Sequence, residues 1–153
     1  MDPYQHADDP ADARLPEDEA GEAPTWQDVL AVGGLAARLA GDGPDQAYAA
    51  LAHMVRNRMR AARASDIRFG DGTWTGALRG LAPGPDSPPP RGDRLTRSQL
   101  RAIARACRVA AGEEGDITRG ATLCHRHDEA PRWARTAEAT ALIGDLIFYR
   151  TPG

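Results

Sequence analysis

The most regular pattern of apolar and polar positions lies in residues 44–60. Small and apolar side chains recur there at the i, i+3, i+4, i+7 and i+8 spacing that places them on one helical face: Ala47, Ala50, Leu51, Met54 and Val55. This spacing predicts an amphipathic α-helix. Pro44 suits the first turn of that helix, where the backbone N–H has no intrahelical partner to lose. The small side chains predict that a second helix can approach closely.

Two further stretches predict helices before and after this one. Residues 26–40 follow Thr25, a suitable N-cap with Asp28 three positions later, and they end at the Gly41–Pro44 breaker. Their expected inward face consists of Leu30, Gly33, Gly34 and Ala37. Residues 97–111 carry another helical pattern. Five of their side chains are expected to face inward: Leu100, Ile103, Ala104, Cys107 and Ala111.

The rest of the chain predicts a loop, two shorter helical stretches and a small sheet. Residues 73–81 favour a short helix, and residues 82–94, with five prolines, predict a loop. Residues 122–127 and 146–150 are typical of short strands. Between them a helix is predicted from Pro131 to Gly144. Together these elements predict an α+β fold, mainly helical with a small antiparallel sheet.

The N-terminal segment differs from the rest in charge. The chain has 153 residues, enough for one domain. Residues 1–24 hold eight acidic residues and one arginine without apolar periodicity, which predicts a disordered acidic tail before a folded domain at residues 25–153. No run approaches about 18 apolar residues, so no membrane span is expected.

The predicted domain is mildly cationic. Without the tail, 14 acidic residues and 18 arginines remain, a net charge of +4, and all 19 basic residues of the chain are arginine. Such an excess suits an anionic partner such as a cell-wall polymer or a nucleic acid, and it is too small to indicate nucleic acid by itself. No basic stretch is interleaved with aromatic residues, so no nucleic-acid partner is expected.

The C-terminal third carries several short motifs in a fixed order. They are Asp116-Ile117-Thr118-Arg119-Gly120-Ala121-Thr122, then His125, Trp133-Ala134, Ile143-Gly144-Asp145 and Phe148-Tyr149-Arg150. With Asn57-Arg58 at the end of the second predicted helix, this order resembles the SleB-type (spore cortex-lytic) cell wall hydrolase family. The resemblance covers about residues 28–150. It implies a lysozyme-like fold that cleaves peptidoglycan glycan strands by a lytic transglycosylase or muramidase mechanism, without a cofactor.

The family depends on one glutamate between the first two helices, but this chain has no glutamate between Glu22 and Glu113. Counting back from Asn57 without a gap puts Leu39 at the catalytic position, which would make the chain an inactive relative. Counting forward from the first helix puts Asp42 there, with a shortened loop. Because deletions are best tolerated in loops, the second alignment predicts Asp42 as the general acid. The simpler interpretation of Asp42 is a residue of the helix–helix turn.

The resemblance also implies a sugar-binding role for three residues. Thr122 is expected to hydrogen-bond the acid or an N-acetyl group, His125 to contact substrate or orient the acid, and Trp133 to offer a face to a sugar ring. The alternatives are a strand threonine, a histidine with both nitrogens satisfied, and a core tryptophan.

Two other functions remain open at this point. One is a catalytically inactive, glycan-binding protein, associated with a phage or a similar particle. The other is a zinc-binding domain that uses Cys124, His125 and His127.

For the main hypothesis we expect a monomer whose partner is the glycan strand. The N-terminus has no hydrophobic signal segment, so we expect a protein that is cytoplasmic as synthesised and meets the wall after release or in a phage-like particle.

Overall fold

The computed structural model describes residues 23–64, 66–81 and 94–151, so the predicted acidic tail and the proline-rich loop fall almost entirely outside the described residues. Within these ranges the elements are α2 (Trp26–Ala40), α3 (Asp45–Arg63), η1 (Ile67–Phe69), α4 (Trp74–Ala77), α5 (Arg97–Ala110), β1 (Leu123–Arg126), η2 (Arg132–Arg135), β2 (Glu138–Ile143) and β3 (Leu146–Arg150). The expected α+β fold with a small antiparallel sheet is confirmed. Among the described residues, no helix has the length and apolarity that a bilayer crossing requires.

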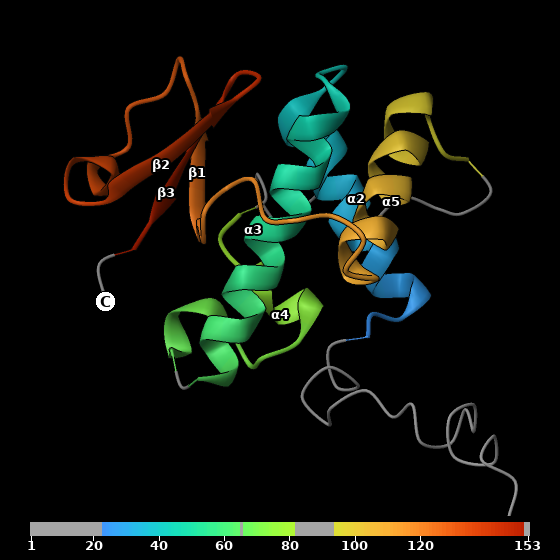
Figure 1. The fold of residues 1–153 in the computed structure, drawn as a ribbon, viewed down its shortest axis with the longest axis horizontal. Coiled ribbons are helices and arrows are strands. Elements are labelled where there is room, and N and C mark those ends of the chain that lie inside the picture. Colours follow the sequence, from blue (N-terminus) through green and yellow to red (C-terminus); the bar gives the residue numbers. More distant parts are fainter. Residues whose placement is uncertain (1–22, 65, 82–93, 152–153) are drawn as a thin grey trace, which may run out of the picture.

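Helix α3 is the centre of the fold. Figure 1 shows it between the sheet on one side and the α2–α5 pair on the other. Every side chain from Ala47 to Val55 is buried, so the middle of α3 is covered on all sides. One apolar cluster joins α3 to α2, α4 and α5, and a second joins it to α2 and the sheet through Tyr48, Leu51 and Phe148. The predicted close approach follows from the many alanines of this helix.

Local capping fixes where α2 begins. The Thr25 hydroxyl accepts from the Asp28 N–H at 3.2 Å, and the Asp28 carboxylate accepts from the Thr25 N–H at 2.9 Å. This reciprocal pair satisfies two backbone N–H groups that the first turn of a helix leaves without partners.

The predicted inward face of α5 is partly wrong. Ile103 is buried as expected, but Leu100 is 53% exposed and Cys107 is also exposed. The buried positions are Ala102, Ile103, Ala106 and Val109. The face of α5 that meets α2 and α3 is thus turned away from the predicted one, which leaves Leu100 and Cys107 on the outside.

The α2–α5 contact is closest at Gly33. A Cβ added there would overlap Cγ1 of Ile103 and lie 3.0 Å from the Ile103 backbone N and Cα. We therefore expect Gly33→Ala to lower the free energy of unfolding by about 1–2 kcal/mol, since overpacking outweighs the gain in helix propensity. Denaturant unfolding measures this.

Gly115→Ala is the matched control, because a Cβ there would meet nothing within 4 Å. It should leave stability unchanged or slightly higher. Equal losses for the two variants would contradict the close packing at Gly33.

The sheet has the order β1–β3–β2, with both pairs antiparallel. The helix predicted from Pro131 to Gly144 is wrong, because only η2 is helical and residues 138–143 form β2. Gly144, at φ 60°, turns the chain directly into β3, so β2 pairs with β3 instead of coiling. A bulge at Thr140 lets its hydroxyl donate to the Thr118 carbonyl at 2.6 Å.

His53 is a buried polar residue of α3. It is 3% exposed, and its Nε2 has no hydrogen-bond partner among the described residues. Burial lowers the pKa of His53, and Arg56 lowers it further, against the opposing effect of the Asp116 and Glu114 carboxylates. His53 is therefore neutral in the folded state at neutral pH.

We expect this histidine to make the fold less stable as the pH falls. Below pH 6.5 the unfolded His53 takes up a proton before the folded one does, so the free energy of unfolding decreases, by at most about 1.4 kcal/mol per pH unit. Denaturant unfolding between pH 7.5 and 5.5 should show a shallower pH dependence in His53→Gln. His127→Gln, at a side chain that is 61% exposed, serves as the control. The same slope in His53→Gln and the natural chain would refute this origin.

Candidate functional site

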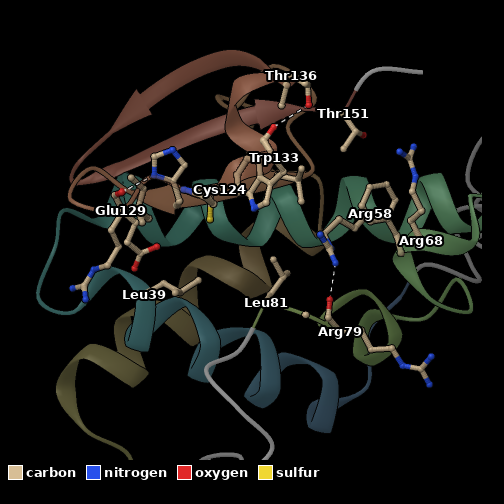
Figure 2. Close-up of a pocket in the computed structure, with 18 of the residues that line it drawn as sticks. Leu39, Arg58, Arg68, Arg79, Leu81, Cys124, Glu129, Trp133, Thr136 and Thr151 are labelled. Carbon is tan, nitrogen blue, oxygen red and sulfur yellow. Dashed lines mark hydrogen bonds between the residues drawn. The ribbon is translucent and has the colours of Figure 1, made fainter.

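A groove with a volume of about 960 Å³ separates the sheet from the helices. One wall comes from β1 and the segment that follows it, including His125, Glu129 and Trp133. The facing wall comes from the end of α2 and from the loops around η1 and α4, including Leu39 and Leu81. Figure 2 shows these two walls with the open space between them. The volume lies within the usual range of ligand-binding clefts.

His125 contributes a ring to the groove, but both of its nitrogens are occupied. Nδ1 lies 2.6 Å from the Arg126 carbonyl oxygen, and Nε2 lies 2.8 Å from the Tyr149 hydroxyl. Because a carbonyl can only accept, Nδ1 carries the hydrogen and the tyrosine hydroxyl donates to Nε2. The interpretation of His125 as a satisfied histidine therefore agrees with the structure. It lines the groove without a free nitrogen.

Trp133 stands beside His125 in the same wall. Its indole forms T-shaped contacts with two rings, with centroid distances of 5.7 Å to His125 and 5.2 Å to Tyr149. The tryptophan is only half-buried, and it lines the groove. These two T-shaped contacts hold the indole in place at the groove wall. Tyr149 belongs to the Phe148-Tyr149-Arg150 motif but was not predicted as a site residue.

Thr122 lies behind the groove wall. It is 8% exposed, its hydroxyl lies 3.1 Å from the Thr151 hydroxyl, and Thr151 is the threonine that lines the groove at this point. The structure therefore brings His125 and Trp133 together in the groove and places Thr122 one layer further in.

Asp42 lies outside this groove. It is exposed in the turn between α2 and α3, and its carboxylate accepts a hydrogen bond of 2.5 Å from the Ser98 hydroxyl on α5. The turn is also tied to α5 by the Arg101–Asp45 ion pair. These contacts fit the simpler interpretation, a residue that fixes the helix–helix turn. The structure does not bring Asp42 together with His125 and Trp133.

Leu39, by contrast, lines the groove. Of the two positions that the alignments offered for the catalytic residue, the structure thus places the leucine in the groove and leaves the aspartate outside it. The geometry favours the ungapped alignment from Asn57.

The zinc hypothesis also meets a geometric obstacle. Both nitrogens of His125 are engaged, and His127 points outward, 3.8 Å from the Asp145 carboxylate. In the ranges that the structure covers, no group of three or more His, Cys, Asp or Glu side chains could hold a metal ion.

Comparisons with known proteins agree with this architecture. The catalytic domain of the Bacillus cereus SleB protein matches with a TM-score of 0.59 and 19% sequence identity, over 89% of this chain and 95% of that chain. The chain has a SleB-like fold. The lysozyme-like architecture expected from the motifs is thereby confirmed. No protein-family model and no curated protein matches the chain.

The motif residues of this SleB-like fold hold in place the backbone segments that line the groove. The Asn57 side chain donates to the Asp116 carboxylate at 2.9 Å and to the Ala121 carbonyl at 3.0 Å. Asp116 also accepts from the Thr118 hydroxyl and from the N–H groups of Thr118 and Gly120. Burial raises the pKa of Asp116, but the hydrogen bonds from Thr118, Asn57 and Gly120 together lower it. The segment that leads into β1 is thus fastened to α3.

Arg58 is a second motif residue that holds this backbone in place. Its guanidinium donates to three carbonyl oxygens, those of Ala77 at 2.7 Å, Thr122 at 2.9 Å and Arg79 at 2.7 Å. It also lies 4.7 Å from the centre of the Phe69 ring. Burial lowers the pKa of Arg58 to about 10, so it remains charged at neutral pH. One side chain therefore joins α3, α4 and the start of β1 beneath the groove.

The groove is strongly cationic. Five arginines line it: Arg38, Arg58, Arg68, Arg79 and Arg126. Among the described residues that line it, Glu129 is the only carboxylate. The amino-acid composition indicates a cationic domain but not this concentration, because the arginines come from segments far apart in the chain.

Proposed function

We propose that this protein binds peptidoglycan glycan strands in the groove between the sheet and the helices. The single observation that supports this most is the groove itself, which combines a fixed tryptophan surface with five arginines in a SleB-like fold. A planar indole suits the apolar face of a sugar ring. Guanidinium groups suit carboxylates, which peptidoglycan provides on its peptide stems, or on the lactyl group of a sugar that carries no stem.

The tryptophan and the arginines make different kinds of contact with the glycan strand. Trp133 provides apolar contact, while Arg38, Arg79 and Arg126 provide charge. Arg68 is already paired with Asp66 at 2.7 Å. The excess positive charge makes binding sensitive to salt, because exposed charges are screened within about 10 Å at 0.1 M ionic strength.

Sedimentation of the protein with insoluble peptidoglycan tests this proposal. We expect Trp133→Ala and Arg79→Met each to weaken binding about tenfold, in the range of a central contact residue. Raising the salt concentration should weaken binding of the natural chain more than that of Arg79→Met.

Two control variants match these substitutions. Trp26 is 59% exposed at the start of α2, and Arg108 is exposed on α5 beside Glu113. Neither lines the groove. Trp26→Ala and Arg108→Met should therefore bind as the natural chain does. Losses equal to those of the groove variants, or a natural chain that stays in the supernatant, would refute the proposal.

A further inference from the structure

The groove accounts for the whole positive excess of the predicted domain. Residues 25–153 contain 18 arginines and 14 acidic residues. Five of these arginines and one of these acidic residues, Glu129, line the groove, which leaves 13 of each kind for the rest of the domain. Because the charges elsewhere balance in number, the groove is the part of the domain where an anionic segment gains most from binding.

Three of the five groove arginines are placed to meet such a segment. Arg58 is buried and donates to three carbonyl oxygens, and Arg68 is paired with a surface carboxylate. The other three are exposed and come from α2, the loop after α4 and β1: Arg38, Arg79 and Arg126. They belong to both walls, so an anionic segment that lies along the groove contacts the two walls together.

The chain itself carries a segment of matching charge. Residues 1–22, called the acidic segment below, lie outside the described residues and hold eight acidic residues and one arginine. Blocks of acidic residues are typical of segments that bind a cationic surface. The acidic segment offers carboxylates, the same groups that the peptide stems of peptidoglycan offer, and guanidinium groups bind both.

The acidic segment is long enough to reach the groove. Arg38 follows Trp26, the first residue of α2, by 12 positions, so the two lie about 18 Å apart along the helix axis. Glu17, Glu19 and Glu22 precede Trp26 by nine residues or fewer, and nine residues of extended chain span about 30 Å. The carboxylates nearest to the domain therefore have the reach to contact the groove arginines.

We propose that the acidic segment occupies the groove when no glycan strand is bound, and that it competes with the strand for the groove arginines. This inference rests on the proposed function and adds to it a competitor from the same chain. Because the segment is joined to the domain, its effective concentration at the groove is about millimolar, so weak contacts are enough to fill the groove. A long strand that also contacts Trp133 displaces it.

Arginine modification tests the contact without peptidoglycan. Phenylglyoxal reacts with accessible guanidinium groups, and peptide mass spectrometry gives the rate at each arginine. The natural chain is compared with a full-length variant in which every acidic residue of the segment becomes its amide: Asp2, Asp8, Asp9, Asp12 and Asp18 to Asn, and Glu17, Glu19 and Glu22 to Gln.

We expect Arg38, Arg79 and Arg126 to react about tenfold more slowly in the natural chain at low salt, the value for a groove that is filled nine-tenths of the time. The internal control is Arg119, which is exposed and lines a separate pocket, and it should react alike in both chains. In about 1 M salt, where the screening length falls to about 3 Å, the difference should disappear.

Sedimentation with insoluble peptidoglycan tests the competition. The amide variant should bind about tenfold more tightly than the natural chain at low salt, because its groove is free. The two chains should bind alike in about 1 M salt.

Three results would overturn the proposal. The first is an equal reaction rate of the groove arginines in the two chains, which would turn any gain in peptidoglycan binding into an effect of net charge. The second is an equal slowing at Arg119, which would mean that the segment does not select the groove. The third is slower reaction of the groove arginines with unchanged peptidoglycan binding. If neither chain bound peptidoglycan while the groove arginines still reacted more slowly in the natural chain, the proposed function would fail and the contact of the segment would stand.

Discussion

Replacing Arg58 with methionine is expected to lower the free energy of unfolding by about 3–5 kcal/mol. Methionine can fill part of the volume of the aliphatic stem, but it donates no hydrogen bond. The carbonyls of Ala77, Thr122 and Arg79 would then lose their donor in or near the protein interior. Each such loss costs about 1–3 kcal/mol. Denaturant unfolding of the natural chain and the variant measures the difference.

Arg68→Met is the matched control. Arg68 lies 5.4 Å from the centre of the same Phe69 ring, but its side chain is 54% exposed and its partner is the surface carboxylate of Asp66. Exposed ion pairs contribute about 0–1 kcal/mol, so this variant should remain nearly as stable as the natural chain. Arg58→Lys should fall between the two, because an ammonium cannot reach three carbonyls in one plane. Similar decreases in the free energy of unfolding for Arg58→Met and Arg68→Met would refute the stabilising role of the three Arg58 hydrogen bonds.

The two cysteines are expected to differ about 10³-fold or more in their rate of alkylation at pH 8. Burial raises the pKa of the Cys124 thiol to about 12, with a smaller contribution from the Glu129 carboxylate and an opposing one from Arg58. Compared with a thiol of ordinary pKa 9.0, it carries about 10³-fold less of the reactive thiolate. Cys107 is exposed on α5 and lacks this protection.

A short pulse of iodoacetamide followed by peptide mass spectrometry measures both rates in one sample. The unfolded chain is the control, and there the two thiols should react alike. Equal labelling in the folded protein would mean that the groove wall around Cys124 is open to water.

The sequence predicted the main helices because their stability depends on local features. The period of apolar residues, the Thr25 capping box and the Gly41–Pro44 breaker all act over a few residues, and the helices begin and end close to where these signals lie. Strands β1 and β3 were located for the same reason. Residues 138–143 were not, since their alanines and leucine suit a helix until β3 offers a strand to pair with.

The candidate site was predicted only where the motifs pointed to it. His125, Trp133 and Leu39 line the groove, whereas Asp42 lies in the α2–α3 turn and accepts a hydrogen bond from Ser98. The best-matching motif residues, such as Asn57, Arg58 and Asp116, hold the backbone. These residues are recognised most easily in the sequence because their order and spacing are set by the backbone contacts that they make.

By itself, the sequence determined where α2, α3 and α5 begin and end and that the domain carries an excess of arginine, since each of these depends on neighbouring residues or on composition. Only the tertiary structure decided which face of α5 is buried, that β2 is a strand, and that arginines from α2, α3, η1, the α4 loop and β1 meet around Glu129 and Trp133. These outcomes depend on contacts between residues far apart in the chain, and packing selects them after the local elements have formed.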